Sequence, residues 1–382
     1  MKYFFTIGLF VILTISLSAQ EEKQSPWSMQ GYVKHLESIF KLDGFDSYLI
    51  DQLIHNRLKF RYEPSAEFQL AIDVRNRIFY GDLVKLSPNY SDQIENGNND
   101  FFDLSVHLVN KDDWVINSTI DRAYLQYTKG ALETRIGRQR INWGISTVWN
   151  PNDLFNAFAF TDFDYEERPG SDAIRVKYYT GVASSIEIAA GAAKTLDRSV
   201  FAALYKWNVA QYDFQILTGY ARGDWVIGSG WAGNLKTAGF KGEWSYFISE
   251  EDKNSLAVTA SIDYSFSNSL YVNAGYLYNS NGETQGTLLD LFSFELSAKN
   301  LYPFRHAIFI SGAYPITPLL NSSLALIYSP ISSHPLFINP TITYSVAQSW
   351  DLDLVGQIAF NQANGKYQSP VTAGFLRLKL SF

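Results

Sequence analysis

The 382-residue chain contains no cysteine, which excludes disulfides, thiolate catalysis, cysteine-based metal sites and a lipoprotein anchor. Charged residues are also scarce, at 18% of the sequence. Beyond residue 19 there is no run of eighteen apolar residues, so helical membrane spans are excluded. The formal net charge of −7 argues against a nucleic acid as partner.

One long segment, from Ala307 to Trp350, has no lysine, arginine, aspartate or glutamate at all. Five prolines interrupt it, and serine, threonine and asparagine fill the gaps between them. Helices do not tolerate prolines at this spacing, whereas strands and turns do. Pro340 falls inside a predicted strand and predicts a β-bulge there.

The N-terminus has the pattern of an export signal. Lys2 supplies a positive start, residues 4–17 are apolar, and Ser18-Ala19 offer a small-residue cleavage site. The alternative is an uncleaved membrane anchor, but the apolar stretch is too short to span a bilayer comfortably. We therefore expect a signal peptide over residues 1–19 and a single domain over residues 20–382.

The mature chain consists of segments of about ten residues with alternating polarity, separated by turns. Such segments predict membrane-spanning strands, and their connections alternate between short and long, as an inserted barrel requires. Eighteen strands are expected, or sixteen if one weak hairpin is merged, so the predicted fold class is an all-β transmembrane antiparallel barrel. The predicted strands are Gln30–Ser38, Leu53–Tyr62, Glu67–Tyr80, Asn117–Tyr127, Leu132–Trp143, Asp172–Tyr179, Ser185–Ala193, Phe201–Ala210, Tyr212–Ala221, Trp225–Leu235, Gly239–Ser249, Leu256–Phe266, Leu270–Asn279, Arg305–Ile316, Ser323–Pro330, Leu336–Ala347, Trp350–Asn361 and Gly374–Phe382.

The last segment, Gly374–Phe382, places leucines and Phe382 on one face and Arg377 and Lys379 on the other. It resembles the final strand of Gram-negative outer-membrane β-barrels, in which a C-terminal phenylalanine is part of the signal for the barrel-assembly machinery. This resemblance implies export to the outer membrane, contact with its lipid, and an encounter of Phe382 with the assembly machinery.

In a barrel surrounded by lipid, polar side chains face inward, because a charge facing lipid at mid-depth costs about 2–4 kcal/mol. Alternation places nine basic residues on the inner faces of neighbouring strands. They either select solutes or only neutralise nearby acids such as Asp73, Asp121, Glu133, Glu187 and Asp213. The predicted channel-lining residues are Arg57, Lys59, Arg61, Arg75, Arg77, Arg122, Arg135, Arg175 and Lys177.

The segment from Gly137 to Asn156 is the most distinctive in the chain. Arg138 and Arg140 interrupt the alternation around Gly137, which predicts a bulge there. The long acidic loop of residues 144–171 follows, and it either folds into the barrel and narrows it or remains a solvated extracellular loop. The candidate constriction residues are Asp153, Asp162, Asp164, Glu166 and Glu167.

The motif Gly-Arg-Gln, Trp-Gly and Asn-Pro-Asn-Asp within residues 137–156 resembles one found in Gram-negative porin-like and alginate-export-type barrels. The resemblance rests on about twenty residues, while the architecture covers the whole chain. It implies a diffusion channel, monomeric or oligomeric, and does not identify the solute.

Three functions compete at this point. A passive channel for small hydrophilic solutes, anionic ones if the basic wall is not neutralised, agrees best with the pattern. An enzyme is not expected, because none of the five histidines belongs to a nucleophile pattern and no metal or phosphate-loop motif occurs, so no cofactor is predicted either. The alternative is a structural, adhesin or secretion-associated barrel plugged by its own loops, for which residues 41–52 and 81–116 are long enough.

Overall fold

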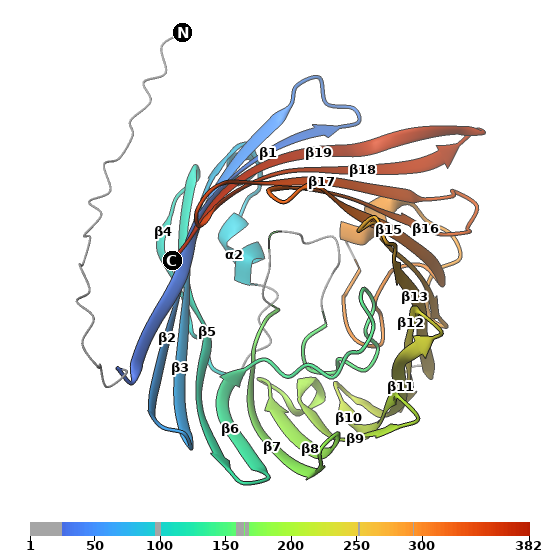
Figure 1. Ribbon diagram of the computed structural model, residues 1–382. Coiled ribbons are helices and arrows are strands. Elements are labelled where there is room, and N and C mark those ends of the chain that lie inside the picture. Colours follow the sequence, from blue (N-terminus) through green and yellow to red (C-terminus); the bar gives the residue numbers. More distant parts are fainter. Residues whose placement is uncertain (1–24, 96–100, 158–163, 165–167, 251–252, 293) are drawn as a thin grey trace.

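The computed structural model describes residues 25–95, 101–157, 164, 168–250, 253–292 and 294–382. They form one antiparallel sheet that closes on itself into a barrel (Figure 1). Closure comes from the pairing of β1 (Trp27–Leu42) with β19 (Lys366–Ser381). The predicted signal peptide, residues 1–19, lies outside the described residues.

Eighteen strands complete the circuit, so the prediction of eighteen rather than sixteen is confirmed, and each predicted segment overlaps one of them. The helices are short, and none in the described part of the chain is long and apolar enough to cross a membrane. The helical elements are α1 (Asp82–Leu86), α2 (Tyr90–Glu95), η1 (Leu196–Arg198) and η2 (Leu288–Phe292). The other strands are β2 (Leu49–Ser65), β3 (Phe68–Gly81), β4 (Ser105–Asn110), β5 (Trp114–Lys129), β6 (Leu132–Gln139), β7 (Ser171–Gly181), β8 (Ser184–Ala192), β9 (Val200–Val209), β10 (Tyr212–Ala221), β11 (Asp224–Leu235), β12 (Ala238–Ser249), β13 (Ser255–Ser265), β14 (Tyr271–Asn279), β15 (His306–Thr317), β16 (Leu320–Tyr328), β17 (Leu336–Ala347), β18 (Trp350–Ala363) and β19.

The short strand β4 is an addition to this circuit that the sequence did not predict. On one edge of β5 lies β3, and the other edge is shared, with β6 pairing to residues 123–129 and β4 pairing to residues 115–119. Beyond the end of β6, β4 pairs with the same edge of β5. The backbone groups of β5 are therefore paired there as well.

The two ends of the barrel differ in their connections. At one end lie short turns, such as those from Val209 to Tyr212 and from Leu235 to Ala238. At the other end lie the long connections, above all residues 140–170 and 280–305. This alternation is the one that an inserted barrel shows.

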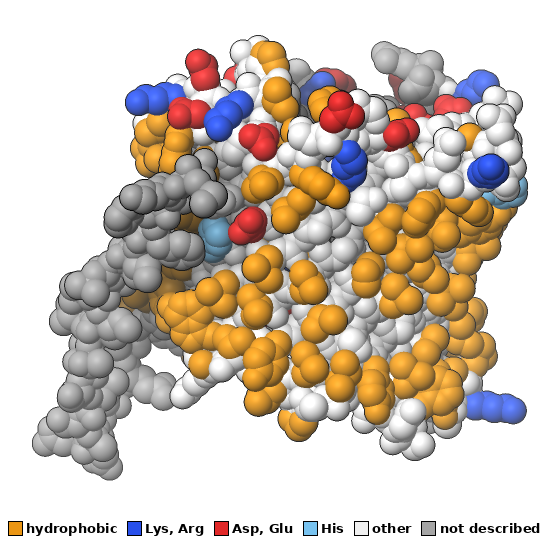
Figure 2. Space-filling view, turned by 90° about the horizontal axis from the view of Figure 1, so that it is seen from above, with side chains coloured by type: hydrophobic (Ala, Val, Ile, Leu, Met, Phe, Trp, Pro, Cys, Tyr) orange, Lys and Arg blue, Asp and Glu red, His pale blue; other side chains and the backbone are white. Residues whose placement is uncertain are grey.

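The outer surface is apolar where the strands cross. On β7, Ile174, Val176 and Tyr178 point outward, and Ile174 is 51% exposed, while Arg175 and Lys177 alternate with them on the inner face. Figure 2 shows hydrophobic side chains in a broad band around the visible side of the barrel and most of the visible charged side chains at one end. Such a band matches the hydrocarbon region of a bilayer.

Pro340 does not create the predicted bulge. The register between β17 and β18 is continuous around it, with Ile338 opposite Ile358 and Thr341 opposite Val355. The carbonyl of Gly356, which faces Pro340, instead accepts a hydrogen bond of 2.7 Å from Asn339 Nδ2. A side-chain amide therefore supplies a donor where the proline has none, and the strand stays regular.

The bulge predicted at Gly137 is also absent from β6, whose register with β5 and β7 is unbroken. Gly137 is needed because its φ is 116° and a Cβ there would come within 2.2 Å of the Ala123 carbonyl oxygen. β6 ends at Gln139, not at the predicted Trp143, and the chain then turns into the barrel.

Candidate functional site

The inner wall formed by β2, β3 and β5 is rich in ion pairs. Arg57, only 1% exposed, lies 3.0 Å from Asp121 and 3.5 Å from Asp73. Arg75 Nε lies 3.2 Å from Asp121, and Arg61 also pairs with Asp73. The sequence left two roles open for these basic residues, solute selection and neutralisation of nearby acids. Because three predicted lining residues contact two carboxylates, neutralisation is one of their roles.

A bulge in β5 brings these groups together. Asp73 pairs with Arg122 and Val74 pairs with Ile120, so Asp121 is the extra residue of β5. Asp121 and Arg122 are consequently both buried, although they are adjacent in the sequence.

The remaining predicted basic residues have varied surroundings. Arg77 donates to Asn117 Oδ1 at 2.9 Å, and Lys59 lies opposite Asp73 in the β2–β3 register. Arg122 donates to the backbone carbonyl oxygens of Asp121 and Arg168.

On β6 and β7, Arg175 pairs with Glu133. Arg135 lies over the Tyr124 ring at 4.4 Å from its centroid. Lys177 lies over the ring of its neighbour Tyr179, at 4.7 Å.

The connection from β6 to β7, residues 140–170, is here called the lumen loop, and Figure 1 shows its described part inside the ring of strands. Trp143, 1% exposed, donates from Nε1 to Glu187 at 2.6 Å, and its carbonyl accepts from Gln215 Nε2 at 2.7 Å. These bonds hold the first turn of the loop against β8 and β10.

The asparagine-rich part of the motif holds the loop to the next strands. Asn152 donates to the Ser229 carbonyl at 3.0 Å and accepts from Ser245 Oγ at 2.8 Å. The backbone N–H of Ile145 donates to Glu243, which is completely buried, at 3.0 Å. Asn152 of the motif and Ile145, which follows the motif's Trp-Gly, thus fix the lumen loop to β11 and β12.

Apolar side chains of the lumen loop pack on an apolar part of the inner wall. One cluster joins Trp143, Leu154 and Phe155 to the inner faces of β7–β12, and the Trp143 and Phe155 rings meet edge to face at 5.2 Å. In a second cluster the ring centroids of Trp149 and Tyr302 lie 5.8 Å apart. Burial of this surface stabilises the loop at roughly 25 cal/mol per Å².

Asp164 connects the lumen loop to the opposite wall. Its carboxylate lies 2.8 Å from Lys34 Nζ of β1 and 3.6 Å from both His55 Nδ1 of β2 and Arg377 of β19. Burial opposes ionisation of Asp164, but the neighbouring His55 and Lys34 outweigh it and hold its pKa well below the usual range. Lys34 was not predicted, because it alternates in phase with Tyr32 and Leu36 and so occupies an apolar-looking face.

Asp153, the other predicted constriction residue that can be placed, is buried and paired with Arg168 at 2.6 Å. Burial raises the pKa of Asp153 to about 6 in spite of this partner. The remaining predicted residues, Asp162, Glu166 and Glu167, lie outside the described residues.

No family model and no curated protein matches the sequence. Solved structures do share the fold. Pseudomonas aeruginosa OpdQ superposes with a TM-score of 0.59 at 7% identity, over 93% of this chain and 98% of that one. P. aeruginosa OccK11 (OpdR) gives 0.58 at 8% identity, over 93% and 96%, and Acinetobacter baumannii OccAB3 gives 0.56 at 10%, over 93% and 99%. The chain therefore has the closed antiparallel barrel fold of these structures.

Proposed function

We propose that the protein is a channel of the Gram-negative outer membrane through which small hydrophilic solutes, preferentially anions, diffuse passively. The observation that carries this proposal is a closed barrel with an apolar outer face and a charged inner face. A closed barrel satisfies every strand edge without water, which is what the hydrocarbon region demands. A polar interior provides the path for hydrophilic solutes.

In this proposal the short turns face the periplasm and the long connections face the exterior. Residues 1–19 direct export and are removed, and residues 20–382 form the barrel. Phe382 follows β19 at the short-turn end, where its backbone exchanges hydrogen bonds of 2.8 and 2.9 Å with Gly31 of β1. We assign to it the contact with the barrel-assembly machinery.

The anion preference rests on the balance of charge in the wall. Residues 55–61 of β2 and 71–77 of β3 carry five basic side chains, those of Arg57, Lys59, Arg61, Arg75 and Arg77, and one carboxylate, that of Asp73. Such a wall favours anions by raising their local concentration. The lumen loop supplies the constriction, with Asp164 set against the basic wall.

The test is the current through purified, detergent-folded protein in a planar bilayer under a salt gradient. We expect stepwise openings with an anion-biased reversal potential. The double variant Arg75→Gln, Arg77→Gln should shift that potential toward zero. Glutamine is chosen over glutamate because Arg75 contacts the buried Asp121, and a third carboxylate there would disturb folding.

Lys236→Gln is the matched control, because Lys236 is exposed in the β11–β12 turn and carries the same charge. Its reversal potential should equal that of the parent protein. Selectivity that is unchanged in the double variant would reduce the proposed lining residues to internal ion pairs.

A second candidate, a plugged barrel acting as an adhesin or secretion partner, is favoured by one observation. Residues 148–156 of the lumen loop are buried, and the loop is held to both walls, by Trp143 on one side and Asp164 on the other. The same recordings separate the two proposals, because silence from demonstrably folded protein would support the plug.

A further inference from the structure

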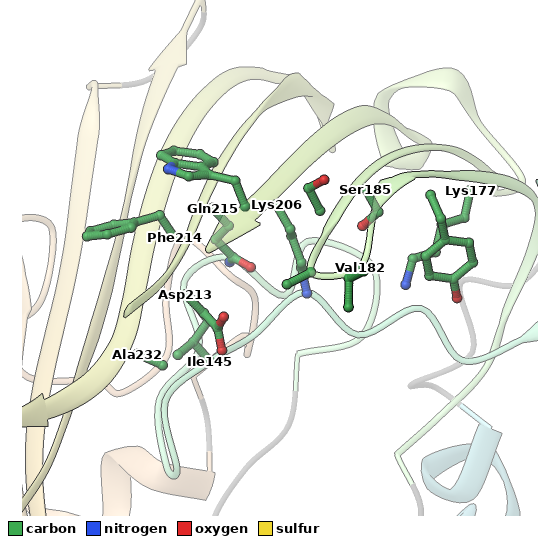
Figure 3. Close-up of a pocket in the computed structure, with 13 residues that line it drawn as sticks. Ile145, Lys177, Val182, Ser185, Lys206, Asp213, Phe214, Gln215 and Ala232 are labelled. Atoms are coloured by element: carbon green, nitrogen blue, oxygen red, sulfur yellow. The ribbon is translucent and has the colours of Figure 1, made fainter. Parts of the chain in front are cut away.

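A recess of about 330 Å³ lies in the inner wall at the short-turn end of the barrel (Figure 3). It includes residues of the turn between β7 and β8, and Ile145 of the lumen loop lies at its edge. Of its polar residues only Lys177 was predicted to line the channel. The polar side chains of the recess are those of Lys177, Ser184, Ser185, Lys206, Asp213 and Gln215, together with the phenol of Tyr179 and the indole N–H of Trp207.

The strand register gathers the central groups of the recess into one row. Ser185 of β8 lies opposite Lys206 of β9, and Lys206 lies opposite Gln215 of β10. Asp213 is two residues from Gln215 and therefore shares its face. In Figure 3 the side chains of Lys206, Asp213 and Gln215 point toward one another, while Phe214 points away from them.

Two ammonium groups in this recess lack an acidic partner. Among the described residues, neither Lys177 nor Lys206 has a carboxylate within salt-bridge distance. Glu187, which lies opposite Lys177 in the sheet, is instead bonded to Trp143 Nε1. This differs from the wall of β2 and β3, where Arg57, Arg61 and Arg75 each contact a carboxylate.

The recess also has acceptors with free capacity. Gln215 is 1% exposed, and its Nε2 is used by the Trp143 carbonyl, but its Oε1 has no hydrogen-bond partner within the described part of the chain. Asp213 accepts one bond, of 2.8 Å, from Asn208 Nδ2, and its carboxylate can accept more. A buried acceptor without a donor is unfavourable, so this position favours a ligand that carries N–H groups.

We propose that the recess binds a small zwitterion of the α-amino acid class. Its carboxylate contacts Lys177 and Lys206, and its ammonium donates to Asp213 and to Gln215 Oε1. A plain anion would leave the acceptors unsatisfied, and a plain cation would meet two ammonium groups. The inference rests on the proposed channel function for the ligand's route into the barrel, and it deepens that function by naming a class of solute.

The test is a ligand-observed NMR titration of detergent-folded protein with three probes of similar size. L-alanine carries both charges, propionate only the carboxylate and ethylamine only the ammonium. We expect L-alanine to bind at least tenfold more tightly than either of the others. Lys206→Met should weaken L-alanine binding at least tenfold, and Asp213→Asn should remove the advantage of L-alanine over propionate.

Lys129→Met is the matched control, because Lys129 is exposed at the same end of the barrel and does not line the recess. It should bind L-alanine like the parent protein. Equal binding of L-alanine by the parent and Lys206→Met, or propionate binding as tight as L-alanine, would overturn the inference. Binding measured by NMR does not depend on conductance, so the two proposals can fail separately. A barrel that conducts no current but binds L-alanine refutes only the proposed channel function. A barrel that conducts but does not bind L-alanine refutes only the proposed binding site in the recess.

Discussion

At the scale of single residues, Asp121 determines how the basic wall is arranged. Alternation identifies inward-facing residues only while the register is continuous, and the extra residue in β5 changes it. The sequence predicted an inward-facing basic wall from alternation and a bulge at Gly137 of β6, whereas the bulge lies at Asp121 of β5. Nothing in the sequence around Asp121 distinguishes a bulge from a regular strand.

Replacing Asp121 tests its role in this cluster. We expect Asp121→Asn to lower the free energy of unfolding by about 3 kcal/mol, because two arginines lose the carboxylate that they share in a buried site. Asp263→Asn, which removes the partner of Lys241 in a partly exposed pair, should cost less than about 1 kcal/mol. Urea unfolding in lipid vesicles, followed by tryptophan fluorescence, measures both. Equal losses would contradict the special position of Asp121.

At the scale of elements, the strands could be predicted and the packing of the lumen loop could not. Each spanning strand needs an apolar outer face, and that requirement appears directly in the sequence. The loop is held by apolar residues on the inner faces of β8–β11, such as Ala189, Leu204 and Leu217. The sequence did contain one indication of this packing. The first half of Val200–Val209 is apolar on both faces, and in a barrel that faces lipid the inward-facing apolar side chains must be covered from inside.

The lumen loop should respond to pH through Asp153. A group whose pKa is raised on folding, here from 3.8 to about 6, favours the folded state at low pH and loses that contribution as the pH rises through this range. The stability of the parent protein relative to Asp153→Asn should therefore fall by roughly 2 kcal/mol between pH 4 and pH 7. Unfolding curves of the two proteins at several pH values measure it, and a difference independent of pH would contradict it.

At the scale of the whole molecule, the seam between β1 and β19 closes the barrel. A Cβ at Gly31 would come within 2.4 Å of the Arg57 carbonyl oxygen and 3.0 Å of the Phe382 ring, whereas one at Gly374, in the same seam, would meet nothing within 4 Å. We expect Gly31→Ala to cost about 1–3 kcal/mol through overpacking and Gly374→Ala to have no effect. The temperature at which each folded band disappears in a gel-shift assay provides the comparison, and identical temperatures would contradict the close packing at Gly31.

The same seam has a consequence for how the protein is made. It pairs Tyr32 with Ser381, so the first strand of the barrel finds this partner only after the last strand has been exported. Until then β1 presents an open edge able to pair with other chains, and long-range pairing of this kind is slow. A chain cut short before β19 would not form a narrower pore. It would keep two unsatisfied edges and become a target for aggregation and proteolysis.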